Sequence, residues 1–325
     1  MTVFIIRRLL QSAVVVLVMS LLVFTGVNIV GDPVDMLINP EAEPAEIEQI
    51  KKNLGLDRPL HEQYGYFLAN AAQGDLGKSF KFGEPALKLI LQRMPATLEL
   101  AVAALLLAIV FGIPLGVYAG LRPESPVSKT IMAGSILGFS LPTFWVGIMM
   151  IMIVAVMLGW LPSTGRGDTV PLFGIELSFL TLDGLRHLIL PAINLALFKL
   201  SLVIRLSRAG TREAIHQDYV KFARAKGLKE GRVVLVHVLK NILIPVVTVL
   251  GLEFGGLIAF SVVTETVFAW PGMGKLIIDS IRELDRPVVV AYLMIVVLMF
   301  VVINLVVDII YSLLDPRVRL QDVKS

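Results

Sequence analysis

Long apolar runs separated by polar segments are the feature that most constrains how this 325-residue chain can fold. Runs of about twenty residues match the length that an α-helix needs to cross the hydrocarbon core of a bilayer. Hydrophobic residues make up 56% of the chain and its mean hydropathy is +0.81, whereas soluble domains are about 45–50% apolar. The sequence therefore predicts an all-α integral membrane protein.

The apolar pattern predicts six transmembrane helices. Arg7 and Arg8 precede the first run, and the positive-inside rule places that end in the cytoplasm. The run Leu9–Val30 is longer than the apolar region of a cleaved signal peptide, so we expect a retained helix. The spans are expected at 9–30, 97–119, 130–158, 188–204, 242–267 and 288–314. The fourth is the weakest because Lys199 interrupts it, and an even number of spans also places the C-terminus in the cytoplasm.

The spans divide the chain into four expected regions. They are an N-terminal transmembrane helix (1–30), an extracytoplasmic loop region (31–94), a five-helix core (95–314) with a cytoplasmic loop (205–240), and a cytoplasmic tail (315–325). Short helices are expected within the loop region, whose ten acids outnumber its seven bases. Gly77, Lys78 and Ser79 resemble the end of a phosphate-binding loop, but Ala72 occupies the position where that motif needs glycine. No nucleotide site is predicted.

The sequence gives no support for catalysis, metal binding or nucleic-acid binding. The chain has no cysteine, and its four histidines are scattered without an HExxH motif. Its net charge is only +3, and the basic residues are not interleaved with aromatic ones. We therefore expect a chain that is not an enzyme and has no catalytic, cofactor-binding or metal-binding residue of its own.

Small residues and prolines within the spans predict how the helices pack. Gly112, Gly116 and Gly120 recur every four residues, a spacing that lets helix backbones approach closely in lipid. We expect packing inside the bundle, with a homodimer contact as the alternative. Four prolines lie in or at the ends of spans, where they can kink or break helices: Pro114, Pro142, Pro191 and Pro245.

A basic segment from Arg205 to Pro245 interrupts the apolar core, with nine Lys or Arg against three acids. Its pattern predicts a helix over residues 211–226 that ends at Gly227, then a second helix over 230–239 leading to a break at Pro245. The first helix would place Ile215, Tyr219 and Phe222 on one face. An apolar stripe suits docking into a partner's groove; a solvated loop beside anionic lipid is the alternative.

Within this segment, DYVKFARAKGL (218–228) and RVVLVHVLKNILIPVVT (232–248) resemble the cytoplasmic loop of B-type permease subunits of dipeptide and oligopeptide ABC importers. The resemblance extends along nearly the whole chain. Further matching motifs are RRLL (7–10), GDP (31–33), LGLDRPL (54–60), GDLGKS (74–79), LGWLP (158–162), ETVFAWPGMGK (265–275) and NLVVDIIYSLLDPRVR (304–319).

The resemblance implies a six-helix type I importer permease fold in the inner membrane. It implies a homologous second permease subunit, two ATP-binding subunits that carry ATP and magnesium, an extracytoplasmic solute-binding protein, and surrounding lipid. Di- and oligopeptides are the expected substrates; glutathione or nickel is the alternative on the same scaffold. A secondary transporter driven by protons through Glu253 and Lys199 is the rival hypothesis.

In such permeases the short helix of the loop sits in a cleft of the ATPase. By position, that coupling role is carried over to Asp218, Tyr219, Ala223, Arg224, Ala225, Lys226 and Gly227. The wider importer class often has Glu-Ala-Ala at the start of this motif, whereas here the sequence is Lys221-Phe222-Ala223. The side chain that makes the leading contact therefore stays open.

Ionisable residues within spans form a second candidate site. A charge at the bilayer centre costs about 2.5–3.5 kcal/mol, so it is expected to face a cavity or a partner. We take Glu253, Lys199 and Asp308 as candidates for the translocation path, with an interhelical ion pair or a proton relay as alternatives. Glu99 and Glu265 lie near predicted outer ends and are expected to be interfacial. The run from Trp270 to Gly274 predicts a rigid turn, either an outer gate, a docking surface or a plain connection.

Overall fold

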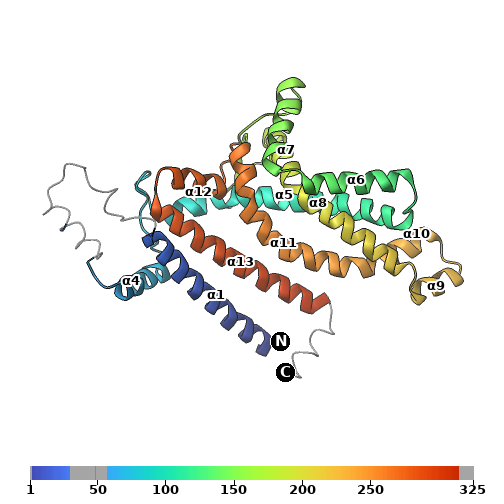
Figure 1. Cartoon of the computed structure of the whole chain (residues 1–325), viewed down its shortest axis with the longest axis horizontal. Coiled ribbons are helices and arrows are strands. Elements are labelled where there is room, and N and C mark those ends of the chain that lie inside the picture. Colours follow the sequence, from blue (N-terminus) through green and yellow to red (C-terminus); the bar gives the residue numbers. More distant parts are fainter. Residues whose placement is uncertain (1, 30–47, 49–56, 315–325) are drawn as a thin grey trace. The chain divides into compact units, whose positions relative to one another are not determined.

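A computed structural model describes residues 2–29, 48 and 57–314 of the chain (Figure 1). The motif at 31–33, the first three residues of the motif at 54–60 and the tail from 315 lie outside the described residues. The chain forms two compact units, each built from separate stretches of sequence. The first unit is Met1–Met94 with Leu276–Val302, and the second is Pro95–Lys275 with Ile303–Ser325.

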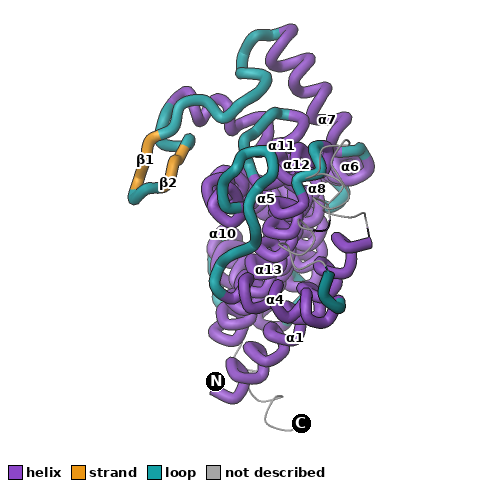
Figure 2. The backbone as a smooth tube through the Cα atoms, turned by 90° about the vertical axis from the view of Figure 1, so that its left-hand side faces the viewer, coloured by secondary structure: helices purple, strands orange, loops and turns teal. Residues whose placement is uncertain are grey.

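The described elements are helices except for one antiparallel hairpin, as Figure 2 shows. In chain order they are α1 (Thr2–Ile29), α4 (Leu60–Ala72), α5 (Ala86–Leu121), α6 (Pro126–Ser140), α7 (Thr143–Met150), the π-helix η1 (Ile151–Met157), β1 (Val170–Leu172), β2 (Ile175–Leu177), α8 (Leu182–Ala214), α9 (Asp218–Ala225), α10 (Glu230–Arg232), the π-helix η2 (Val233–Val238), α11 (Leu239–Val267), α12 (Met273–Arg282) and α13 (Arg286–Leu314).

Among the described residues, five helices are long and apolar enough to cross a membrane, and a bent pair would make a sixth span. The pair is α6 followed by α7 and η1, which meet at an angle of 107°. The span expected over 130–158 is therefore a bent pair of helices, broken at Pro142, one of the prolines predicted to kink or break a helix. The break falls at Leu141, which has an extended backbone (φ −82°, ψ 136°). Pro142 follows it, and a proline disfavours helical geometry in the residue before it.

Helix α8 is the central helix of the second unit and packs against both α6 and α11. It is longer than the expected span at 188–204 and buries a large part of its surface, including Leu188, Val203 and Ile204. It is the least apolar of the five long candidate spans among the described residues, as predicted, and Lys199 is buried within it. Pro114, Pro191 and Pro245 likewise lie inside helices α5, α8 and α11.

The glycine repeat on α5 lets that helix approach α8 closely. A Cβ atom added to Gly116 would lie 2.5 Å from the Ile204 carbonyl oxygen, and one added to Gly120 would lie 2.6 Å from Thr211 Cβ. Gly112 would meet Val203 at 2.7 Å. The predicted packing inside the bundle is thus confirmed for this repeat.

This close approach predicts that Gly116→Ala destabilises the protein by about 1–3 kcal/mol, because two helices must separate to admit the methyl group. Thermal unfolding of the purified subunit in detergent measures the change. Gly134→Ala on α6 is the matched control, because a Cβ there has nothing within 4 Å. Equal thermal midpoints for the two variants would contradict close α5–α8 packing.

Apolar residues from three helices form the core behind this contact. Ala108 of α5, Val203 of α8, and Val246 and Leu250 of α11 are all at most 3% exposed and pack together. These contacts hold α8 and α11 together, and the segment that links them contains α9.

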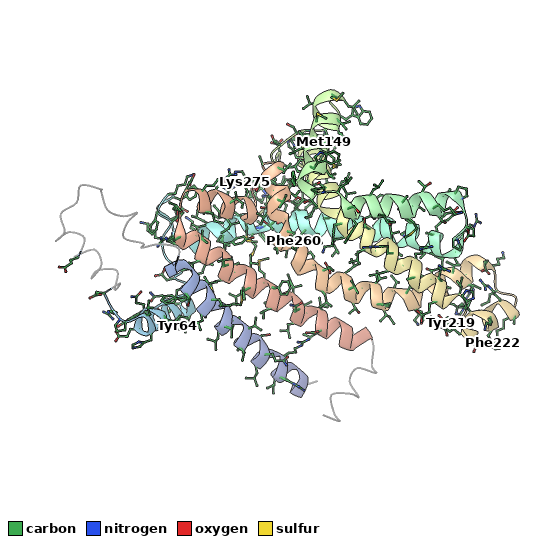
Figure 3. All side chains as sticks on the ribbon, in the orientation of Figure 1. Tyr64, Met149, Tyr219, Phe222, Phe260 and Lys275 are labelled. Carbon is green, nitrogen blue, oxygen red and sulfur yellow. The ribbon has the colours of Figure 1, made fainter. Side chains whose placement is uncertain are left out.

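In the first unit, α1 packs against α4. The hydroxyl groups of Ser20 and Tyr64 lie 2.8 Å apart, and the Phe24 ring lies 5.4 Å from that of Tyr64 (labelled in Figure 3). The segment that resembled a phosphate loop has a structural role. Ser79 donates a hydrogen bond to the Asp285 carboxylate, which also accepts from the Phe80 amide at 3.1 Å.

Candidate functional site

The basic segment between α8 and α11 forms two helical pieces joined by turns. Helix α8 ends at Ala214, and α9 starts again at Asp218 after a turn. A single helix over 211–226 was therefore wrong. The interruption also changes the register, so Ile215 packs into the apolar cluster below α9, while Tyr219 and Phe222 do not share its face.

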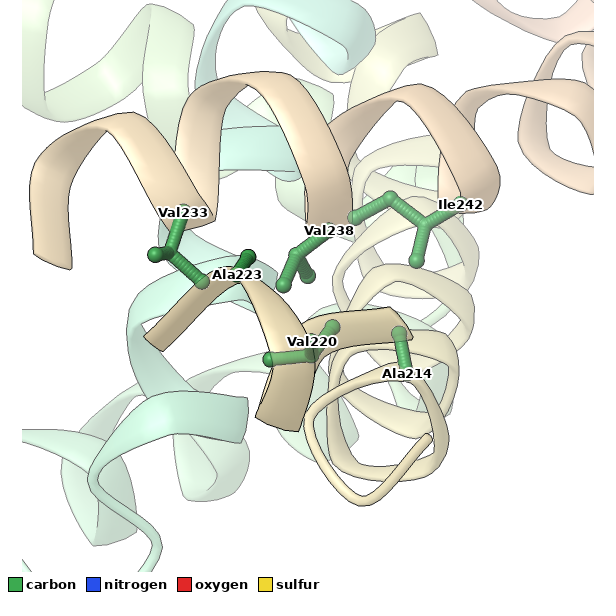
Figure 4. Packing of buried hydrophobic residues seen from close by; sticks show 6 residues of the cluster. All are labelled: Ala214, Val220, Ala223, Val233, Val238 and Ile242. Atoms are coloured by element: carbon green, nitrogen blue, oxygen red, sulfur yellow. The ribbon is translucent and has the colours of Figure 1, made fainter. Parts of the chain in front are cut away.

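Helix α9 rests on a cluster of small aliphatic side chains, shown in Figure 4. Its own contributions are Val220 and Ala223, which are 0% and 4% exposed. The other members come from the flanking helices: Ala214, Val233, Val238 and Ile242. A helix of eight residues is too short to be stable alone, so this apolar base determines where α9 lies.

The other face of α9 presents two aromatic rings to the outside. Tyr219 is 40% exposed and Phe222 is 61% exposed (Figure 3). The ammonium group of Lys226 lies 4.5 Å from the centre of the Phe222 ring. The surface of α9 thus combines exposed aromatic area with positive charge, and the buried face leaves these side chains free to contact a partner.

A glycine turn reverses the chain after α9. Gly227 has φ +73°, a left-handed conformation that glycine adopts without steric cost, and its amide donates to the Arg224 carbonyl at 2.9 Å. The Arg224 guanidinium pairs with Glu230 at 2.5 Å, and this hydrogen bond raises the pKa of Arg224. The turn and the ion pair together tie α9 to the start of the next helix.

That next helix runs without interruption from 230 to 267 through α10, η2 and α11. The predicted second helix is therefore confirmed at its start, whereas the break expected at Pro245 is wrong. Helix α9 is therefore packed against the end of α8 at Ala214 and against the start of this next helix at Val233 and Val238.

The seven residues assigned to coupling all lie on α9 or in the turn that follows it. The side chains of Asp218 and Lys221 pair at 2.9 Å and are exposed, Ala225 is exposed, and Ala223 is in the buried base. Phe222 was absent from the assigned set although its exposed ring is the larger aromatic surface. The sequence did contain a signal for Phe222, because the apolar pattern of the segment includes it.

The structure brings two of the charged candidates in the spans together. The Lys199 ammonium on α8 forms an ion pair with the Glu253 carboxylate on α11. Their side chains are 8% and 37% exposed, so the lysine is buried and the glutamate reaches a surface. Asp308 lies half-buried on α13. Their place on a translocation path remains a prediction.

Glu99 was expected at a membrane interface, but its carboxylate is buried and fully bonded. Arg166 donates to it through two nitrogens, at 3.1 and 2.7 Å. The Ser178 amide and hydroxyl and the Phe179 amide donate at 2.7 to 2.9 Å. One α5 carboxylate therefore holds the loop between η1 and α8 at two places, before β1 through Arg166 and after β2 through Ser178 and Phe179.

Glu265 was also expected to be interfacial and is instead completely buried at the end of α11. It accepts hydrogen bonds from Thr97 at 2.7 Å, from Ser261 at 2.9 Å and from the Lys275 amide at 2.9 Å. The indole of Trp270 donates to the Ala96 carbonyl at 2.9 Å. The turn predicted from Trp270 to Gly274 is thus confirmed as far as Gly272, whereas Met273 and Gly274 begin α12 (Met273–Arg282). The position of the turn is fixed by Ala96 and Thr97 of α5.

The described residues include no group of three or more His, Asp or Glu side chains that could hold a metal ion. The candidate features of the second unit are the exposed aromatic face of α9, the Lys199–Glu253 ion pair between α8 and α11, and two segments held by the buried carboxylates Glu99 and Glu265.

Two family profiles cover almost the whole chain. Residues 112–320 match the family described as binding-protein-dependent transport system inner membrane component, and residues 1–101 match the N-terminal region of the same class of membrane component. The chain belongs to this family. It is a multi-pass membrane permease of the ABC importer type.

Similar proteins share this family along their full length. The chain is 43% identical to the di/tripeptide transport system permease protein DppB of Pseudomonas aeruginosa, over 93% of this chain and 94% of the relative. It is 39% identical to the oligopeptide transport system permease protein AppB of Bacillus subtilis, over 98% and 100% of the two chains. It is 37% identical to the glutathione transport system permease protein GsiC of Escherichia coli, over 97% and 98%.

A solved structure supports the type I permease fold. An inward-facing form of the MetNI methionine ABC transporter aligns with a TM-score of 0.56, covering 70% of this chain and 96% of that chain at 18% identity. The predicted fold class and family are therefore confirmed, with five described spans or six when the bent pair is counted as one.

Proposed function

We propose that this permease moves short peptides across the inner membrane and that separate ATP-hydrolysing subunits drive it through α9. The observation that carries the proposal is an exposed aromatic surface on a helix whose opposite face is buried between α8 and α11. Helices that dock into grooves use anchors of this kind. The coupling residues are Asp218, Tyr219, Ala223, Arg224, Ala225, Lys226 and Gly227, together with Phe222.

The partners follow from membership of an importer family. We propose a homologous second permease subunit, two ATP-binding subunits that hold ATP and magnesium, and an extracytoplasmic solute-binding protein. The chain itself binds no cofactor and catalyses no reaction. Both termini lie in the cytoplasm in this proposal, on the same side as α9, because the basic residues outside the long 31–94 loop favour that side.

Peptides are the proposed substrates because relatives that share most of the chain are named as di/tripeptide and oligopeptide permeases. Glutathione is the second candidate, since one relative is named for it and glutathione is itself a tripeptide. The Lys199–Glu253 pair, with Asp308, is the proposed polar lining of the path. A cationic and an anionic side chain on transmembrane helices can meet the charged ends of a peptide.

Reconstitution tests this function directly. The complete complex in proteoliposomes is expected to take up a labelled dipeptide only when ATP, both ATPase subunits and the loaded binding protein are present. Uptake by this chain alone, driven by a pH gradient, would instead support a proton-coupled carrier.

The glycine turn gives a more specific expectation. Gly227→Val should abolish ATP-driven uptake, because a β-branched residue at φ +73° is sterically unfavourable and the turn must change its path. A Cβ there has no atom within 4 Å, so the effect acts through the backbone and not through a clash. The variant should still insert, as membrane fractionation will show. Gly231→Val is the matched control on the same segment, with equally open surroundings; equal uptake by both variants would contradict this expectation.

A further inference from the structure

The C-terminal part of α8 carries a row of arginines on one face. Arg205, Arg208 and Arg212 are three and four residues apart, and residues at that spacing lie above one another on a helix. Helix α8 has 33 residues and is therefore about 50 Å long, whereas a bilayer with its headgroups is about 40–45 Å thick. The ends of a spanning α8 thus reach the headgroups, and this arginine face lies at the end next to α9.

No carboxylate of the described residues pairs with the arginine face. The guanidinium carbon of Arg205 lies 4.7 Å from the centre of the Phe139 ring on α6. The Nε atom of Arg208 is buried, and no atom of the described chain accepts a hydrogen bond from it. Arg212 is exposed. Buried donors in native proteins nearly always have a partner, so Arg208 indicates an acceptor that comes from outside the chain.

Helix α5 brings further positive charge to the same end of α8. A Cβ atom added to Gly120, near the end of α5, would lie 2.9 Å from the Arg208 carbonyl oxygen. Arg122 follows directly after α5, and its guanidinium carbon lies 5.8 Å from the centre of the Tyr118 ring. Arg122 is exposed and also lacks a carboxylate partner in the part of the chain that the structure describes. The end of α5 therefore extends the basic surface.

The acids of this region leave the basic surface uncompensated. Residues 122–139 and 201–214 contain five Lys or Arg and two acids. Glu124 pairs with Lys129 at 3.5 Å. Glu213 follows Arg212 in sequence and so lies about 100° around α8 from it. A net positive surface at headgroup level attracts anionic lipid.

Apolar side chains lie on the membrane-centre side of the arginine face. Helix α6 packs along α8 (Figure 1), and the Phe139 ring stacks on the Phe198 ring with centroids 4.7 Å apart. Phe198 precedes Arg205 by seven residues, or about 10 Å along the helix. On α6, Ile136 lies one turn before Phe139, and these side chains are 56% and 45% exposed. Charge at the helix end with apolar surface further in matches a phospholipid, with its phosphate outside and its acyl chains inside.

We propose that this surface binds an anionic phospholipid of the cytoplasmic leaflet. Arg208 and Arg212, with Arg122, hold the phosphate, and an acyl chain lies along Phe139 and Ile136. Guanidinium groups donate two parallel hydrogen bonds to a phosphate, which makes arginine well suited to this role. A free phosphate ion would leave the adjoining apolar surface uncovered. The choice of leaflet rests on the proposed function, which places α9 in the cytoplasm.

A tryptophan placed beside the site tests the binding. The complete complex carrying Ile136→Trp is reconstituted in phosphatidylcholine vesicles that contain increasing amounts of brominated phosphatidylglycerol or, as the reference, brominated phosphatidylcholine. Quenching of the parent complex is subtracted. Half-maximal quenching should need about tenfold less phosphatidylglycerol than phosphatidylcholine. Leu137→Trp is the matched control, because Leu137 is 59% exposed and lies about 200° around α6 from Phe139. Both lipids should quench it equally.

Charge removal shows which side chains bind the lipid. Adding Arg208→Gln and Arg212→Gln to the Ile136→Trp complex should abolish the preference for phosphatidylglycerol. Lys229→Gln with Arg232→Gln removes two exposed charges near α9 but outside the arginine face, and should leave the preference unchanged. Arg212→Gln alone changes only an exposed side chain, so it keeps the fold, and it should lower the preference about threefold.

Several results would overturn the lipid site. They are equal quenching by the two lipids, a preference that survives the loss of both arginines, and loss of the preference when millimolar inorganic phosphate is added, which would indicate a site for the free ion. Absence of quenching at Ile136→Trp would show that another subunit covers this face, and would also reject it. Both leaflets of these vesicles have the same lipids, so the measurement does not depend on transport. A complex that prefers phosphatidylglycerol but lacks ATP-driven uptake would contradict the proposed function and leave the lipid site intact.

Discussion

Replacing both Tyr219 and Phe222 by alanine is expected to abolish ATP-driven uptake while the permease still inserts. The two rings are 40% and 61% exposed, so they contribute little to the core, and their removal leaves Val220 and Ala223 in the buried base. Truncating an aromatic anchor at an interface typically costs at least about 2 kcal/mol. Two such losses total about 4 kcal/mol, or roughly a thousandfold weaker docking of the ATPase subunits.

Co-purification of the ATPase subunits with the permease measures the docking, and uptake in proteoliposomes measures the coupling. Lys221→Ala is the matched control on the same helix, because both side chains of its pair with Asp218 are largely exposed and such pairs contribute about 0–1 kcal/mol. If the double variant retained its ATPase subunits as well as the Lys221→Ala variant does, the aromatic face of α9 would not be the docking surface.

Some features of the region around α9 could be predicted from the sequence, and others could not. The basic segment, the glycine stop at Gly227 and the start of a second helix at 230 were all readable, because local charge and turn chemistry determine them. The exposed face was assigned with the wrong register, because the turn at 215–217 depends on how Ile215 and Val220 pack against η2 and α11. That packing joins residues that are distant in sequence, and periodicity within one segment does not contain it.

Glu99 and Glu265 were expected at the membrane interface, and their burial also depends on residues distant in sequence. An isolated glutamate near the end of an apolar run has the same sequence pattern whether it meets water or a set of donors. Glu99 is bonded by residues 67 to 80 positions away and Glu265 by Thr97, 168 positions away. Only the folded chain shows that both glutamates anchor loops. Buried carboxylates of this kind are stable when each oxygen is hydrogen-bonded.

The bend between α6 and α7 was predictable in its position but not in its angle. Pro142 was identified as a site that can break a helix, and the break occurs there. Its angle of 107° was not predictable, since a proline removes a hydrogen bond and restricts one neighbour but does not specify the direction of the next helix.

Breaking the Lys199–Glu253 ion pair is expected to cause a large loss of stability. Glu253→Met is expected to destabilise the permease by about 3–5 kcal/mol, because it leaves the Lys199 ammonium buried without its partner. Lys199→Met should cost less, since the remaining Glu253 side chain is 37% exposed, against 8% for the lysine. Thermal unfolding in detergent measures both changes. Lys88→Ala, which breaks an exposed pair with Glu84, is the control and should cost no more than about 1 kcal/mol.

The double variant Lys199→Met with Glu253→Met separates a structural role from a transport role. Replacing both members of a buried ion pair by apolar residues of similar volume is often neutral or stabilising, so the thermal midpoint should return to near the wild-type value. Uptake should nevertheless stay at least about tenfold below wild type, because an apolar lining no longer meets the charged ends of a peptide. If the double variant regained both its stability and its uptake, the pair would serve only to hold α8 against α11, and the path would have to be lined by other residues.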